Sequence, residues 1–206
     1  MRLRATLLLA ALSGGFGQQA SADLCEFTGN YDQRFIANIV IGARIVPLEI
    51  AFEDYQFMVF DACEAMGLPY DEVCTTYPLM GDIGMNALAT TCSGVPKIVY
   101  DRRLSSHVGY AGAQAILAHE LGHIWCGHLD DTVNASNAHQ FELEADRFAG
   151  GLMRLLGFDQ NQALSFVPIL SEQSNHSHPA RSDRIEALLA GWQEPDFVQS
   201  CIGRVR

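Results

Sequence analysis

The chain has 206 residues, of which 24 are acidic and 13 are basic, so its formal net charge is −11 at pH 7. A surplus of negative charge of this size argues against nucleic acid and anionic lipid as partners, because both would repel the chain. The length is sufficient for one domain with a hydrophobic core and too short for us to expect two.

The first 22 residues are typical of a cleavable secretory signal peptide. Arg2 and Arg4 form a basic start, an apolar run follows at 5–12, and small residues stand at Ala20 and Ala22. We therefore predict cleavage after Ala22 and an exported protein, secreted or periplasmic. The alternative is an uncleaved membrane anchor, which we disfavour because the apolar run is well short of the roughly 20 residues that span a bilayer. No later segment is long and apolar enough to span one.

All cysteines follow the predicted cleavage site, and an exported chain meets an oxidising compartment. We therefore predict three disulfides, although the spacing does not choose among the pairings. A zinc site made of cysteines alone is the disfavoured alternative, because the chain has no C-x-x-C pair. The six cysteines are Cys25, Cys63, Cys74, Cys92, Cys126 and Cys201.

The N-terminal half is predicted to hold helices, then loops, then a short strand. Apolar residues between 31 and 66 recur at helical spacing, which predicts two helices or one kinked helix with a break near 42–47. Residues 70–94 are rich in Gly, Thr, Asp and Pro and are predicted to be loop with short strands. The β-branched run Lys97–Tyr100 predicts a strand.

The C-terminal half is predicted to be helical. Apolar and small residues recur at helical spacing over 111–128 and again over 138–156, and the polar residues 130–137 predict a turn between these helices. A polar stretch at 171–182 precedes a short helix predicted at 183–190.

The first of these helices carries His119-Glu120-Leu121-Gly122-His123, an H-E-x-x-H pattern. Positions four apart on an α-helix differ by about 40° around its axis, so both imidazoles can bind one metal ion. Glu120 lies about 100° from His119, where a carboxylate can take a proton from metal-bound water. The alternative is a solvated helix face with coincidental histidines.

A catalytic zinc needs a third protein ligand, and Glu142 on the next helix is the strongest candidate. Asp146 lies four residues later on the same face and is expected to accept the other ring N–H of a ligand histidine. Glu144 is expected to face solvent. Gly122 and Ala145 leave room for the two helices to approach closely. The alternative for these acidic residues is a helix N-terminus favoured by the macrodipole.

Other candidate ligands fit less well. The longer H-E-x-x-H-x-x-G-x-x-H motif would need Gly and His where the chain has Cys126 and Leu129. His128 would lie on the opposite face of a continuous helix, so we expect a surface or capping histidine. Cys126 is expected in a disulfide, and His107 and His139 are expected to be ordinary surface histidines.

The motifs HELGH and ELEADRFAG, at 119–123 and 142–150, resemble those of the HtpX and CaaX prenyl-protease family of gluzincin peptidases, in its exported soluble branch. The resemblance covers roughly residues 84–190. It implies an α+β, mainly helical, zincin-like peptidase domain over 23–206, in which the HExxH helix packs on an ExxxD helix. It also implies that Glu142 is the third zinc ligand.

The resemblance extends to residues around the expected active site. Asn86–Ala89 is similar to the segment before the family's active-site edge strand, which would be Lys97–Tyr100, and an extended substrate would add along that strand. His178-Pro179 followed by Arg184 is similar to a downstream element. Arg184 would then stabilise the oxyanion or pair with a carboxylate in the core. His178 would contact substrate or occupy the fourth zinc position as a latency ligand.

The expected function is that of a zinc endopeptidase with one Zn²⁺ per chain, which hydrolyses peptide bonds of extracytoplasmic proteins. Broad envelope quality control follows more naturally than one defined substrate. Many family members have several transmembrane helices, and this chain does not, so a membrane-embedded substrate is not expected. Six cysteines are unusual in the family and suggest a rigid exported form. The alternatives are a catalytically silent zinc-binding or chaperone-like module and a disulfide-tied interaction protein.

Overall fold

The computed structural model describes residues 25–29, 34–69, 74–129 and 137–205, so the signal peptide predicted for 1–22 lies outside the described residues. The described strands form a closed barrel in the order β1-β2-β3-β4-β6-β5. The strands are β1 (Cys25–Phe27), β2 (Ala37–Ile41), β3 (Arg44–Ile50), β4 (Pro78–Gly81), β5 (Ala87–Cys92) and β6 (Val95–Asp101).

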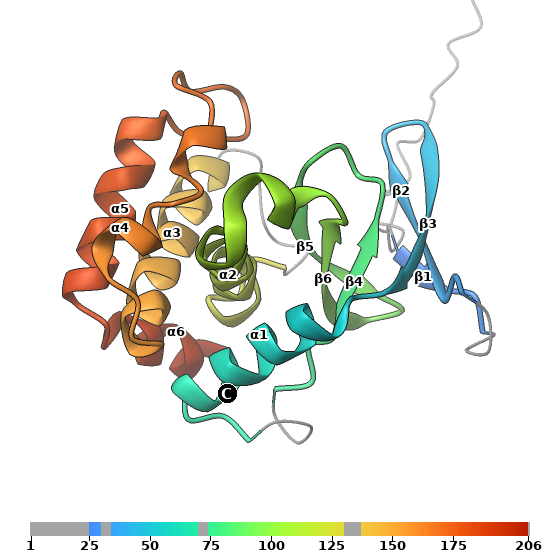
Figure 1. The fold of residues 1–206 in the computed structure, drawn as a ribbon, viewed down its shortest axis with the longest axis horizontal. Helices are drawn as coiled ribbons and strands as arrows, with labels where there is room; N and C mark the ends of the chain where they lie inside the picture. Colours follow the sequence, from blue (N-terminus) through green and yellow to red (C-terminus); the bar gives the residue numbers. More distant parts are fainter. Residues whose placement is uncertain (1–24, 30–33, 70–73, 130–136, 206) are drawn as a thin grey trace, which may run out of the picture.

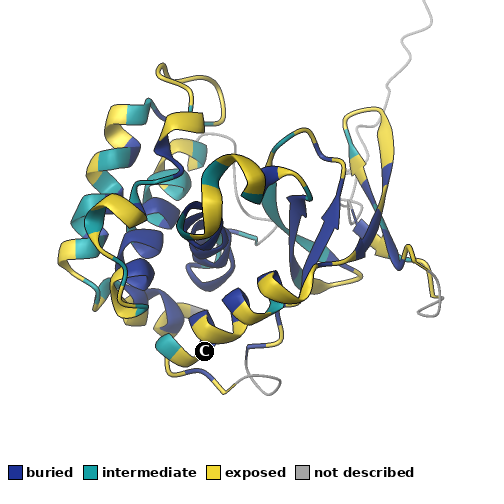
Figure 2. Cartoon of the chain, in the orientation of Figure 1, coloured by how far each residue is buried: buried dark blue, intermediate teal, exposed yellow. Residues whose placement is uncertain are grey.

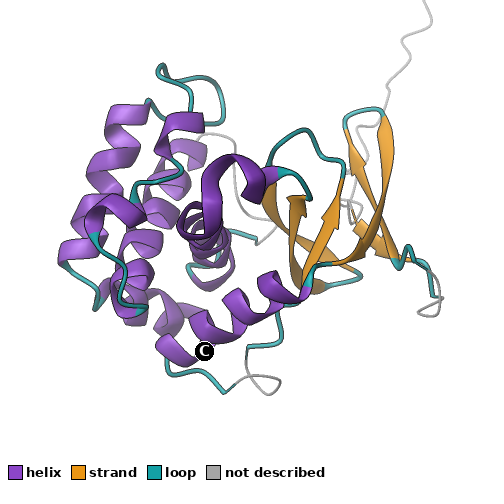
Figure 3. Ribbon diagram, viewed as in Figure 1, coloured by secondary structure: helices purple, strands orange, loops and turns teal. Residues whose placement is uncertain are grey.

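The helices gather beside the barrel. Helix α2 lies at the centre, with α3, α4 and α5 on one side of it and the barrel on the other (Figures 1 and 3). The helices are α1 (Glu53–Ala65), α2 (Leu104–Trp125), α3 (Ala138–Leu155), α4 (Gln160–Ala163), α5 (Arg181–Gln193) and α6 (Phe197–Val205), with a 3-10 turn at Val167–Ile169.

The closed barrel shows that the predicted fold class was wrong. A mainly helical zincin-like fold with a small edge-strand element was expected, whereas six strands close on themselves. The helices predicted between 31 and 66 are the β2–β3 hairpin followed by α1. In the hairpin, Ile39 and Leu48 are buried while Val40 and Ile45 are exposed, which is the alternation of strands. The break predicted near 42–47 covers the hairpin turn at 42–43 and the first residues of β3.

Strand β6 separates two hydrophobic cores. Val99 points into the barrel, where it packs with the apolar residues of β2, β3 and β4. Its neighbours Ile98 and Tyr100 point the other way and belong to the core shared with the helices. Tyr100 stacks there on Tyr55 of α1, with ring centroids 3.7 Å apart. Period-two alternation thus lets one strand serve both cores, and Figure 2 shows β6 and most of α2 as buried.

Close backbone contacts fix α3 between its neighbours. A Cβ at Gly122 of α2 would lie 2.9 Å from Ala145 Cα of α3, so the close approach predicted at this pair is present. On the other side, a Cβ at Gly150 of α3 or at Gly191 of α5 would collide with the backbone of the facing helix. The helix that carries the acidic motif is therefore held at a short distance from the helix that carries the histidines.

The three predicted disulfides are present, and the structure gives their pairing. Cys25–Cys92 ties β1 to β5 where the barrel closes, Cys63–Cys74 ties the end of α1 to the following segment, and Cys126–Cys201 ties the end of α2 to α6. Among the described residues, no helix is long and apolar enough to cross a membrane.

Candidate metal centre

The central helix α2 brings both motif histidines to one buried spot. His119 and Glu120 are each only 6 % exposed, and His123 lies one turn further along. The Nε2 atoms of His119 and His123 lie 3.1 Å apart. The four-residue spacing on a continuous helix therefore has the expected result, with both rings directed at one point.

Glu142 of α3 brings its carboxylate to the two imidazoles. Its Oε1 lies 3.3 Å from His123 Nε2, and its Oε2 lies 3.5 Å from His119 Nε2. Ligand atoms at the usual bond lengths of a tetrahedral zinc site are about 3.4 Å apart. The two imidazole nitrogens lie 3.1 Å apart, and each faces one oxygen of the carboxylate at 3.3 or 3.5 Å, so these separations suit one ion bound between the two rings and the carboxylate. These three residues can hold a metal ion.

An orphaned oxygen supports the same fit. Oε2 of Glu142 is buried and has no hydrogen-bond partner. Side-chain nitrogen atoms near it include those of His119 at 3.5 Å and of Arg184 and His178 at 3.7 Å. A buried carboxylate oxygen without a partner is costly. A cation bound between this oxygen and the two imidazoles would satisfy it.

Asp146 and Arg184 lie behind His119. Asp146 Oδ1 is 2.9 Å from His119 Nδ1, so the carboxylate can accept the ring N–H and leave Nε2 free for a metal. Arg184 of α5 donates to both oxygens of Asp146, at 2.7 and 2.8 Å. Arg184 is 6 % exposed, so its guanidinium pairs with a carboxylate in the core while one nitrogen lies 3.7 Å from Glu142.

The electrostatics of this cluster favour positive charge at its centre. Burial opposes charge on the His119 ring, but the carboxylates of Asp146 and Glu142 outweigh burial and raise its pKa to about 10. Burial also opposes charge on Glu142, yet His119 and His123 hold the pKa of that carboxyl far below its usual range. The negative oxygens thus attract a cation, whether a proton or a metal ion.

His128 and Glu144 do not lie where they were predicted. The expected surface position of His128 assumed a continuous helix, but α2 ends at Trp125 and the chain reverses at Gly127, which has a φ of 82°. His128 is therefore 8 % exposed, and its Nδ1 lies 3.0 Å from His123 Nδ1. Its Nε2 lies 2.9 Å from Glu144 Oε2, so Glu144 faces this ring and not solvent. Burial lowers the pKa of His128, which favours the neutral ring.

The other histidines differ in their distance from the cluster. His178 Nε2 lies 3.7 Å from Glu142 Oε2, and its side chain is 45 % exposed. It lines the cavity but lies outside the group of three donors. His107 is exposed at the start of α2, and His139 is also exposed, with Nε2 2.7 Å from the carbonyl oxygen of Asn175.

The cavity beside the cluster has a volume of about 370 Å³. Glu120 lines it together with the candidate ligands, and one end of β5 forms another part of its wall. Apolar side chains complete the lining, so water is partly displaced beside the donor atoms. The larger apolar residues of the lining include Met85, Leu88, Leu104, Ile116, Phe166 and Ile169.

The strand beside the cavity is not the one predicted. Lys97–Tyr100 does form a strand, but β6 pairs with β4 on one side and β5 on the other, so its edges are occupied. Strand β5 pairs with β1 only at Cys92, so within the described residues Ala87–Ala89 pair with β6 alone. The available edge therefore belongs to β5.

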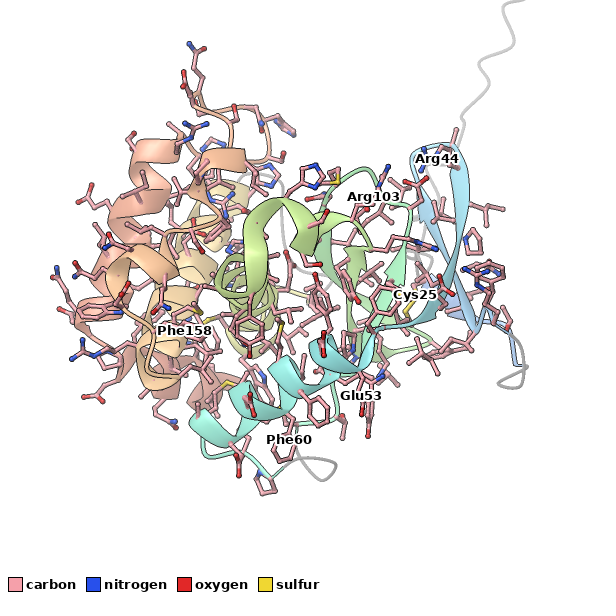
Figure 4. All side chains as sticks on the ribbon, viewed as in Figure 1. Cys25, Arg44, Glu53, Phe60, Arg103 and Phe158 are labelled. Atoms are coloured by element: carbon pink, nitrogen blue, oxygen red, sulfur yellow. A yellow bond between two sulfur atoms is a disulfide. The ribbon has the colours of Figure 1, made fainter. Side chains whose placement is uncertain are left out.

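A polar network holds the start of β5. The buried carboxylate of Asp101, at the end of β6, accepts hydrogen bonds from the backbone N–H groups of Gly84 and Met85 at 3.0 Å. Arg103 donates to the same carboxylate at 2.9 Å, and Figure 4 labels Arg103 where the barrel meets α2. Sequence reasoning missed Asp101, because only the folded chain brings residues 84–85 to residues 101–103.

Comparison with known proteins supports metal dependence at the family level. Residues 103–153 match the model of the Peptidase_M78 family, described as the IrrE N-terminal-like domain. The match covers about a quarter of the chain, including all of α2 and most of α3. It supports a metallopeptidase-like family with metal-dependent peptidase or regulatory function, and it does not single out the HtpX and CaaX proteases. No curated protein and no solved structure shows significant similarity to the chain.

Proposed function

We propose that this chain is a zinc-dependent endopeptidase of extracytoplasmic proteins, an exported relative of the HtpX and CaaX prenyl proteases. His119, His123 and Glu142 hold one zinc ion in this proposal. The observation that carries it is the convergence of two imidazoles and one carboxylate from two helices, with contacts of 3.1 to 3.5 Å, beside a cavity that Glu120 also lines. Two histidines and one glutamate with an open fourth position are a donor set of catalytic zinc.

Zinc at this position would polarise a scissile carbonyl and lower the pKa of bound water. Glu120 is the general base in our proposal, because it neighbours His119 on α2 and lines the same cavity. It takes the proton from water and returns it to the leaving amine. Asp146 keeps His119 in the tautomer with Nε2 unprotonated, through the 2.9 Å contact with Nδ1.

Two cationic or polar side chains can stabilise the negative charge that develops on the substrate. Arg184 fixes Asp146 and has one nitrogen 3.7 Å from Glu142, so it adds positive potential without leaving its core pairing. His178 is partly exposed at the cavity, and we assign it to substrate contact. The alternative, a latency ligand, requires His178 to bind the metal in the resting enzyme.

The substrate is proposed to bind in extended form along the available edge of β5. Ala87–Ala89 line the cavity and pair with β6 alone among the described residues, so their outward backbone groups can pair with a peptide. Recognition through backbone atoms suits broad proteolysis of unfolded chains. Export, through the signal peptide proposed for 1–22, agrees with the three disulfides.

The test is a comparison of wild type and Glu120→Gln, purified with intact disulfides from an oxidising compartment without added metal. We expect about one zinc per chain in both proteins and casein cleavage by wild type alone, abolished by a chelator and restored by zinc. Gln keeps the size of the side chain but cannot accept the proton. Zinc binding without cleavage would instead indicate a catalytically silent zinc-binding or chaperone-like module. Absence of zinc would indicate a disulfide-tied interaction protein.

A further inference from the structure

The second ligand histidine has a buried partner that the proposed mechanism does not use. We infer that His128 is a positioning residue, which accepts the Nδ1–H of His123 and thereby keeps His123 Nε2 free and aimed at the metal. The inference rests on the proposed metal site. It assigns a role to a histidine outside both motifs.

His123, His128 and Glu144 contact one another in series, and the carboxylate of Glu144 at one end of the series and the proposed metal at the other fix the direction of each hydrogen bond. Glu144 is a carboxylate and can only accept, so the 2.9 Å contact to its Oε2 requires a proton on His128 Nε2. In the proposed site the metal binds Nε2 of His123, so Nδ1 is the nitrogen of this ring that carries the proton. In the 3.0 Å contact between the two Nδ1 atoms, His123 therefore donates and the lone pair of His128 Nδ1 accepts. His123 Nε2, 3.1 Å from His119 Nε2, is left with its lone pair.

His128 is held in place by α3 and, through α3, by α6. Its ring packs on Phe141 of α3, with centroids 4.5 Å apart. The acceptor Glu144 is itself fixed by Arg204 of α6, whose Nη1 lies 2.7 Å from the other carboxylate oxygen. The disulfide Cys126–Cys201 ties α6 to the chain two residues before His128. The disulfide and the ion pair thus support the contact between His128 and His123.

The two ligand histidines are consequently supported in different ways. His119 gives its Nδ1–H directly to the carboxylate of Asp146, which in turn pairs with Arg184. His123 reaches its carboxylate through an intervening neutral imidazole. Loss of such a supporting partner typically weakens metal binding by about 10–100-fold.

Two substitutions separate a hydrogen-bonding role from a packing role. His128→Phe keeps a ring against Phe141 but removes the acceptor, whereas His128→Gln loses the ring but can accept from His123 and donate to Glu144. We expect the zinc dissociation constant, measured by chelator competition, to rise about 10–100-fold in the Phe variant. The Gln variant should stay within a few-fold of wild type. The exposed His107 provides the control, and His107→Ala should change nothing.

The outcomes distinguish the possible failures. If His128→Phe binds zinc as wild type does, or binds it better than His128→Gln, the ring acts through packing and the inference is wrong. If wild type binds no zinc, the proposed function fails first. Thermal unfolding of each metal-free protein monitors the fold, and His128→Ala, which also removes the acceptor, replaces a Phe variant that does not fold.

Discussion

The contact between α2 and α3 at Gly122 can be tested by adding one methyl group. In Gly122→Ala, the new Cβ would lie 2.9 Å from Ala145 Cα, 3.0 Å from Ala145 O and 3.2 Å from Phe148 Cβ. Two of these atoms belong to the backbone of α3, so the helices must separate by a few tenths of an ångström. Such overpacking costs about 1–3 kcal/mol, and the better helix propensity of Ala returns about 1 kcal/mol. We expect a net loss of about 1 kcal/mol.

The same shift should affect the metal more than the fold. His119 and His123 would move on α2 relative to Glu142 on α3, and metal sites tolerate changes of only about 0.2 Å in ligand distance. We therefore expect zinc binding by Gly122→Ala to weaken about tenfold or more. Chelator competition measures the affinity, and thermal unfolding of the metal-free protein measures the stability, with a midpoint about 2–4 °C lower.

Gly203 of α6 is the matched control, because a Cβ there meets no atom within 4 Å. Gly203→Ala should leave zinc binding unchanged and stabilise the protein by up to about 1 kcal/mol. If Gly122→Ala is as stable as Gly203→Ala and binds zinc like wild type, the two helices do not pack as closely as described. The argument for the metal site from helix proximity would then be wrong.

Two further predictions concern acid stability and the cavity. Arg103 holds the pKa of Asp101 far below its usual range. The ionised carboxylate therefore stabilises the fold above about pH 4, and this stabilisation is lost as the pH falls further. In urea unfolding from pH 6 to pH 2, the free energy of unfolding should fall less steeply for Asp101→Asn than for wild type. An equal decline in both proteins would contradict this assignment. His178→Ala should reduce peptide cleavage with unchanged zinc affinity, whereas higher basal cleavage with weaker zinc binding would show that His178 is a latency ligand.

Short-range features of this protein were predictable because helical geometry is local. Helices were predicted at 111–128 and 138–156, and α2 and α3 cover most of these residues. His119 and His123 face one point because they are four residues apart on one helix. The strand at Lys97–Tyr100 was also predicted, from its β-branched residues, and lies within β6.

The barrel was missed because its apolar spacing is ambiguous over short distances. Ile36, Ile39 and Val40 fit a helical face as well as they fit a strand. What decides between them is the pairing of β2 with β1 and β3, in a barrel that the distant pairs β4 with β6 and β1 with β5 complete. The same non-local pairing buries both edges of β6 and leaves the edge of β5 beside the cavity.

The sequence by itself determined the metal-binding pattern, the acidic pair on the next helix and the number of disulfides. Each depends on residue identity and on spacing within one turn of helix or on a simple count. Only the tertiary structure decided which cysteines pair, which strand borders the cavity and that His128 returns to contact His123. These features depend on where the chain reverses and on which distant segments meet. Contacts across the whole fold determine both, and spacing along the sequence does not show them.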